Sequence, residues 1–141
     1  MGNRRRAREC ALQLLYDLEF NVVSDDQQKA RAFQDYWSAF PDDSQAKGEI
    51  RQFAETLVNG VREHDEEIDN CIRGASTNWK LERMAVVDRN ILRIATYELR
   101  HRPDIPPKVS LNEAIEIAKR YGTSDSSSFI NGILDKISAT P

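Results

Sequence analysis

Residues 81–100 read LERMAVVDRNILRIATYELR, and their apolar side chains cover a wide arc of the helix that this spacing predicts. A helix that is apolar over so much of its circumference is usually central and surrounded by other helices. The arc comprises Leu81, Met84, Ala85, Val87, Ile91, Leu92, Ile94, Ala95 and Leu99. We therefore expect Ile91 and Leu92 to lie in a core that other helices cover.

The segments before this helix carry narrower apolar stripes at the same helical period. Stripes at 7–18, 27–40, 50–61 and 65–73 predict four amphipathic helices. Pro41 closes the second, Gly74 ends the fourth, and the capping types at 42–44 (Asp42, Asp43 and Ser44) precede the third. Each of these helices has one face to bury, which is typical of a bundle.

Two further helices follow the loop at 102–107. Ser110 and Glu113 form an S-x-x-E capping box for the sixth, which ends at Gly122. Ser124 or Asp125 can cap the seventh. No segment alternates with the period of a strand, and 141 residues suit one domain. We expect an all-α, single-domain bundle over 1–141, of about seven helices in two subdomains that could meet along the fifth.

The composition indicates a cytoplasmic protein without cofactor or metal. No apolar run approaches the roughly 20 residues of a membrane span, and no apolar segment follows the basic start as in a secretory signal. Cys10 and Cys71 both lie on apolar stripes, and no Cys/His cluster exists in the sequence. We interpret both cysteines as reduced core thiols.

Catalytic chemistry has little support in the sequence. The only histidines, His64 and His101, have no Ser or Cys partner at a recognisable spacing. The glycines form no phosphate-binding loop. The serines at 126–128 belong to a helix start, where capping explains them. We do not expect an enzyme.

Arginines crowd the first eight residues, although the net charge of the chain is −3. Arg4, Arg5, Arg6 and Arg8 precede or form the first turn of an amphipathic helix, where cations oppose the helix dipole. Binding of a polyanion would explain why the chain carries arginines where they lower the stability of the helix. Arginine suits RNA because its planar guanidinium group binds phosphates and stacks on bases. The alternative is a solvated basic tail without function.

Tyr16 lies on the same flank of this helix as Arg8, two turns further on. Its ring could stack on an unpaired base or simply border the core.

Polar residues also interrupt the wide arc of the helix at 81–100, namely Asp88, Arg89, Arg93 and Glu98. An internal ion pair or a contact with a partner protein can explain them.

Four runs of residues, taken in order, resemble the NusB family of transcription antitermination factors. They are RRRARECALQLLY (4–16), DRNILRIATYEL (88–99), IPPKVSLNEAI (105–115) and, near the C-terminus, YG (121–122), Asp125 and FINGILD (129–135). The resemblance covers nearly the whole chain and is weakest at 21–45. Its C-terminal half is the more specific part, because arginine-rich starts are common.

The resemblance implies a function that composition cannot show. NusB-like proteins bind single-stranded boxA RNA of nascent ribosomal RNA transcripts together with the ribosomal protein NusE, and they join the antitermination complex of RNA polymerase. Carried over residue by residue, the RNA-binding set is Arg4, Arg5, Arg6, Tyr16, Glu82, Tyr121, Asp125 and Phe129. Asp88 would face NusE. Ser128 stands where some relatives carry lysine, and Asp125 could instead cap the seventh helix.

Other interpretations stay open at this point. The same fold serves as the RNA-binding domain of a ribosomal RNA cytosine methyltransferase, but we expect a free-standing adaptor because no catalytic domain follows within this sequence. A helical protein-interaction module with an incidental basic tail is a further alternative. Both a monomer and a homodimer are compatible with the sequence.

Overall fold

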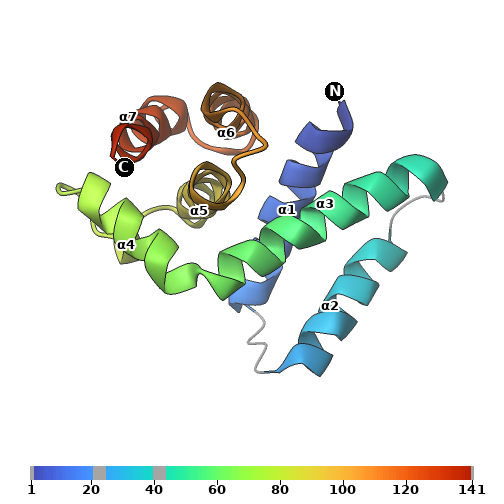
Figure 1. Ribbon diagram of the computed structural model, residues 1–141. Helices are drawn as coiled ribbons and strands as arrows, with labels where there is room; N and C mark the ends of the chain where they lie inside the picture. Colours follow the sequence, from blue (N-terminus) through green and yellow to red (C-terminus); the bar gives the residue numbers. More distant parts are fainter. Residues whose placement is uncertain (1, 21–24, 40–43, 141) are drawn as a thin grey trace. The chain divides into compact units, whose positions relative to one another are not determined.

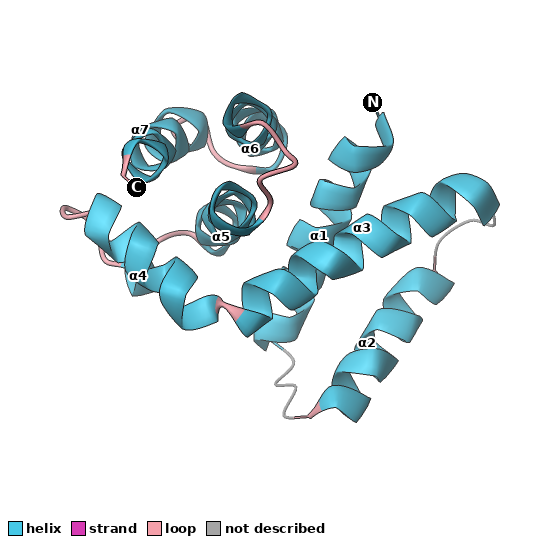
Figure 2. Ribbon diagram, in the orientation of Figure 1, coloured by secondary structure: helices cyan, strands magenta, loops and turns pink. Residues whose placement is uncertain are grey.

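The computed structural model describes residues 2–20, 25–39 and 44–140, and within these it consists of helices and connecting turns without a strand (Figures 1 and 2). The helices are α1 (Gly2–Phe20), α2 (Asp26–Ser38), α3 (Ser44–Glu63), α4 (Asp65–Ala75), the 3₁₀ turn η1 (Leu81–Arg83), α5 (Val86–His101), α6 (Pro107–Tyr121) and α7 (Ser126–Ala139). The expected all-α class is confirmed. None of the described helices is long and apolar enough to cross a membrane.

Contacts divide the chain into two compact units, Met1–Val58 and Asn59–Pro141. The division falls inside α3, whereas α5, along which we expected two subdomains to meet, belongs wholly to the second unit.

The first unit is built on the apolar stripe of α1. The residues that the helical period placed on this stripe are all buried, namely Ala7, Cys10, Ala11, Leu14, Leu15 and Leu18. Phe33 and Trp37 of α2 are buried as well, and Tyr36 donates a hydrogen bond to Gln13 of α1 at 3.1 Å. Cys10 is fully buried, and this burial raises the pKa of its thiol, as expected for a core residue. The capping prediction at Asp42 and Asp43, and the helix stop at Pro41, lie outside the described residues.

The second unit is organised around α5, which contacts α4, α6 and α7 (Figure 1). Ile91 and Leu92 are buried as predicted, and Leu92 has no exposed surface at all. Two polar side chains of α5 find partners inside the unit. Arg93 donates two hydrogen bonds to the carboxylate of Asp69 on α4, at 2.9 and 3.2 Å, and Ser110 of α6 donates one to the buried Glu98 at 2.7 Å. Arg93 therefore forms an internal ion pair as expected, but the pair is with Asp69 of α4, within the second unit and not between two subdomains.

The prediction of one helix over 81–100 is wrong at its start. Residues 81–83 form the separate turn η1, and Met84 and Ala85 are extended, with ψ of 150° and 140°. Leu81 and Met84 are nonetheless buried. The apolar pattern correctly predicted that these positions are buried. A 3₁₀ turn buries them as well as another turn of α-helix would.

The capping box predicted at Ser110 and Glu113 does not start α6. The helix begins three residues earlier, at Pro107. Proline is favoured in the first helical turn, because its fixed φ suits the helix and its missing N–H would have had no partner there. Ser110 is thus inside the helix, and its hydroxyl donates a hydrogen bond to the carboxylate of Glu98.

Truncation of Leu92 to alanine tests the central position of α5. We expect Leu92→Ala to lower the free energy of unfolding by about 2–5 kcal/mol, because a fully buried leucine leaves a cavity. Val109→Ala is the control, since Val109 of α6 is 41% exposed and a surface change costs less than about 0.5 kcal/mol. Chemical denaturation measures both, and equal losses would show that α5 is peripheral.

Candidate nucleic-acid interface

The first turns of α1 present three exposed arginines, Arg4, Arg5 and Arg6. The Arg4 guanidinium lies 4.5 Å from the centre of the Phe53 ring on α3, an arrangement in which ring and cation attract each other. Arg6 pairs with Glu9 one turn later, at 3.3 Å. α1 has no acidic residue in its first turn, so its N-terminal end carries three exposed cations, of which Glu9 offsets one.

Arg8 differs from the other arginines because it is only 2% exposed. Its guanidinium lies 5.4 Å from the centre of the same Phe53 ring. The residue follows Ala7 on the buried side of α1, where its aliphatic stem is covered. Three of the four arginines at the start are therefore exposed, whereas Arg8 is packed in the interior of the first unit.

Tyr16 is 45% exposed and forms an aromatic pair with Phe20, which is 59% exposed. The two ring centres are 4.7 Å apart. Exposed aromatic rings are surfaces on which an unpaired base can stack, so this pair is a candidate stacking surface. Phe20 was not predicted, although its position four residues after Tyr16 puts it on the same side of α1 and could have indicated the pair.

In the second unit, three predicted residues surround the connection between α6 and α7. Tyr121 is the last residue of α6 and is 41% exposed, with the Arg120 guanidinium 5.5 Å from its ring centre. Asp125 immediately precedes α7 and is exposed, and Phe129 lies one turn into α7 and is half-buried. The fold thus gathers an anion and two aromatic rings around one short turn.

Gly122 and Ser126 hold this turn together. The N–H of Gly122 donates to the Ala118 carbonyl at 2.8 Å, and the N–H of Thr123 donates to the Ser126 hydroxyl at 2.9 Å. A Cβ atom on Gly122 would collide with the Ser126 side chain, so only glycine fits here. The predicted helix stop at Gly122 is confirmed, and its reason is this close approach. Asp125 makes no capping hydrogen bond with its side chain, which leaves the carboxylate exposed.

Trp79 adds an exposed aromatic surface that the sequence pattern did not predict. Its side chain is 62% exposed, and its ring meets that of Phe129 edge to face, with 6.2 Å between the centres. Its position in a connector between two helices could have indicated an exposed ring, because a connector residue does not belong to the buried apolar stripe of a helix. Trp79, Phe129, Tyr121 and Asp125 all belong to the second unit.

Glu82 lies exposed on η1 and forms an ion pair with Arg73 of α4 at 2.9 Å. The hydrogen bond from Arg73 lowers the pKa of Glu82 below its usual value, so the carboxylate is ionised at neutral pH. The Arg73 cation offsets its charge, which reduces the repulsion that a lone carboxylate would exert on a polyanion.

Asp88 lies in the first turn of α5 and is only 9% exposed. The position suits an acidic residue, because the helix dipole favours negative charge there. One of its carboxylate oxygens is buried and has no hydrogen-bond partner among the described residues. Buried acceptors are normally satisfied, so this oxygen has an unused capacity for a donor.

The sequence model of the NusB family matches residues 5–139. A transcription antitermination protein NusB from Myxococcus xanthus is 46% identical over 137 residues, which cover 97% of this chain and 95% of that protein. A protein of the same name from Trichlorobacter lovleyi is 50% identical over 141 residues, covering 100% of this chain and 94% of that protein.

Solved structures give the same result for the fold. NusB of T. maritima superposes with a TM-score of 0.77 at 40% identity, covering 97% of this chain and 91% of that one. A chain from a complex of the antitermination factors NusB and NusE with double-stranded RNA has a TM-score of 0.80 at 23% identity, covering 100% of this chain and 99% of that one. At that identity the second likeness concerns the fold alone.

Adding a methyl group at Gly122 tests whether the close approach shapes the α6–α7 turn. We expect Gly122→Ala to destabilise the protein by about 1–3 kcal/mol, as overpacking does. Gly132→Ala in α7 is the control. A Cβ there meets nothing within 4 Å, so the change should stabilise by roughly 0.5–1 kcal/mol through helix propensity. Thermal and chemical unfolding measure both, and a neutral Gly122→Ala would contradict the tight turn.

Proposed function

The chain belongs to the NusB family, and from this premise we propose that it acts in transcription antitermination by binding boxA-type RNA of ribosomal RNA transcripts together with NusE. The observation that carries the proposal is the match to antitermination proteins of that name over nearly the full length of both chains. In this role the protein is an adaptor within the RNA polymerase complex and performs no catalysis.

Phosphate groups are the proposed ligands of Arg4, Arg5 and Arg6. Their exposed guanidinium groups share the N-terminal end of α1, and arginine binds phosphate oxygens through paired N–H groups. Such contacts supply affinity and position the strand without reading its sequence.

Base recognition is the proposed role of the aromatic and acidic residues. Single-stranded RNA is read by stacking its bases on aromatic rings and by hydrogen bonds to their edges. Tyr16 on α1, and Tyr121 and Phe129 at the α6–α7 turn, offer ring surfaces, and Trp79 extends the surface beside Phe129. Asp125 and Glu82 are acceptors for base amino groups or ribose hydroxyls.

Asp88 is the proposed contact for NusE. The exposed part of its side chain would present negative charge to a donor on that protein at the start of α5. The limited exposure of the side chain restricts such a contact to one that reaches the start of α5.

Replacement of Arg4, Arg5 and Arg6 by alanine tests the phosphate contacts. Three contacts to single-stranded RNA contribute about −2 to the slope of log affinity against log salt concentration. We expect the triple variant to flatten the slope by about that amount and to weaken boxA and scrambled RNA by similar factors. Filter binding or fluorescence anisotropy at several salt concentrations gives the slope.

A matched control for this variant replaces Lys29, Arg31 and Lys136 by alanine, which removes the same formal charge from α2 and α7. The control should change the slope little. An arginine variant that keeps the parent's affinity and slope would mean that the basic start is a solvated tail and that the RNA site lies elsewhere.

Tyr16→Ala should behave in a different way from the arginine variant. Losing a base stacked on an aromatic ring costs about 1–3 kcal/mol, whereas the salt slope should hardly change because no phosphate contact is removed. Its ratio of boxA to scrambled affinity should fall. Binding isotherms with both RNAs measure this ratio, and an unchanged affinity would assign Tyr16 to the edge of the core.

Asp88→Asn tests the partner contact with little change in side-chain size. Asparagine keeps one acceptor oxygen but removes the charge, and a hydrogen bond to a charged group is worth about 1–1.5 kcal/mol more than a neutral one, which predicts a roughly five- to ten-fold rise in Kd for NusE. RNA binding by the isolated chain should persist. Asp135→Asn, at an exposed acid of α7, is the control. Titration calorimetry with NusE measures the Kd of both variants and of the parent. If Asp88→Asn binds NusE like the parent, Asp88 has only a structural role.

A further inference from the structure

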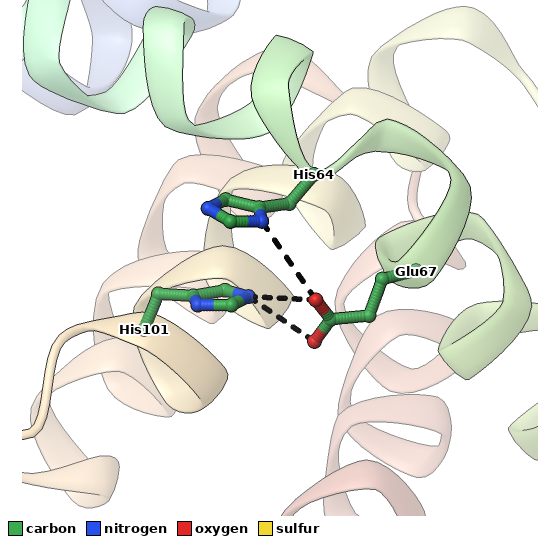
Figure 3. Close-up of side chains that lie close together, drawn as sticks. All are labelled: His64, Glu67 and His101. Carbon is green, nitrogen blue, oxygen red and sulfur yellow. Dashed lines mark hydrogen bonds and ion pairs between the residues drawn. The ribbon is translucent and has the colours of Figure 1, made fainter.

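Two imidazoles and one carboxylate meet in the second unit, at His64, Glu67 and His101 (Figure 3). His101 Nε2 lies 3.0 and 3.1 Å from the two carboxylate oxygens of Glu67, and His64 Nδ1 lies 3.8 Å from one of them. The imidazole rings are stacked, with centres 3.9 Å apart. One ligand atom from each residue falls within 4.8 Å of the other two.

These residues come from three elements. His64 connects α3 to α4, Glu67 lies in the first turn of α4, and His101 is the last residue of α5. No histidine pair at helical spacing exists in the sequence, so the residue pattern alone does not indicate a metal site. Packing of α4 against α5 brings the ligand types together.

The arrangement exceeds what a hydrogen-bonded His–Glu pair requires. A single imidazole, that of His101, already engages both oxygens of Glu67. The second imidazole is stacked on the first, and its own ring nitrogen faces the same carboxylate (Figure 3). Two imidazole nitrogens and one carboxylate are a donor set typical of zinc sites that keep a position for water.

The surroundings favour a cation that arrives from solvent. The three side chains are 37%, 49% and 26% exposed, in the order His64, Glu67 and His101. An open depression of about 750 Å³ adjoins His64 and Glu67, and three further carboxylates line it, those of Glu63, Asp65 and Glu66. The C-terminal end of α5, where His101 lies, also favours positive charge. The N-terminus of α4 disfavours it, but the acidic first turn of that helix offsets this effect.

We propose that His64, Glu67 and His101 form a binding site for a divalent transition metal ion, with Zn²⁺ as the favoured ion and water completing its coordination. Ligand bonds of about 2.0–2.2 Å require the two rings to tilt toward a common point, and partial exposure of all three side chains permits these rotations. The Tyr97 ring lies beside both imidazoles, with centres 5.7 and 6.3 Å away, and supports them. The bound ion would link the α3–α4 junction to the end of α5.

Calorimetric titration of the metal-stripped full chain with ZnCl₂ tests the proposal. We expect one zinc ion per chain. His64→Ala, His101→Ala and Glu67→Gln should each raise the Kd by at least about 10–100-fold, because even the loss of a group that only supports a ligand has effects of that size. Two controls should bind like the parent: Glu66→Gln, which removes a neighbouring carboxylate, and Cys71→Ser, which removes the thiol that lines the same depression. MgCl₂ should give no binding, because Mg²⁺ prefers oxygen ligands.

Two further measurements make the result independent of variant folding. Co²⁺ should give a visible absorption band of a four- or five-coordinate site in the parent, and Glu67→Gln should lose it while its circular dichroism stays native. Zinc should also raise the unfolding temperature of the parent but not of that variant, since an ion that binds only the folded state stabilises it. Failure of the parent to bind zinc would overturn the proposal. So would equal affinity of all variants, or loss of binding in Cys71→Ser alone.

Discussion

Burial of α5 on several sides is the constraint on which the second unit depends. Its apolar surface is too wide for one neighbour to cover, so α4, α6 and α7 all contact it. The polar groups that are buried with α5 must then find partners inside the unit, as Arg93 does with Asp69 and Glu98 with Ser110. These bonds tie α4 and α6 to α5 at defined positions.

The candidate RNA surfaces follow from this packing and from that of α1. Because α6 and α7 both pack on α5 and on each other, the turn between them is short, and Gly122 permits the close approach that it needs. Tyr121 ends α6 and Phe129 lies near the start of α7, and Asp125 lies in the short turn between these helices. α1 in the first unit buries its apolar stripe, which leaves Arg4 to Arg6 and Tyr16 on its exposed sides.

Sequence patterns predicted helices well and their first residues less well. The stripe of α1 and the buried Ile91 and Leu92 followed from the 3.6-residue period, because burial of one helical face is a local property. The start of α5 and that of α6 did not follow. A 3₁₀ turn buries Leu81 and Met84 as effectively as a helix does. The Ser110 hydroxyl donates a hydrogen bond to the carboxylate of Glu98 on α5 and does not cap α6.

The sequence by itself determined the all-α class, the position of the central apolar helix, and the family that the arginine-rich start and the C-terminal runs indicate, because these depend on local spacing and on the order of motifs. Only the tertiary structure decided that Arg8 is buried while Arg4 to Arg6 are exposed, that Trp79 lies against Phe129, and that His64 and His101 share Glu67. The physical reason is that exposure and contact depend on which helices pack together, and residues far apart in the chain become neighbours only through that packing.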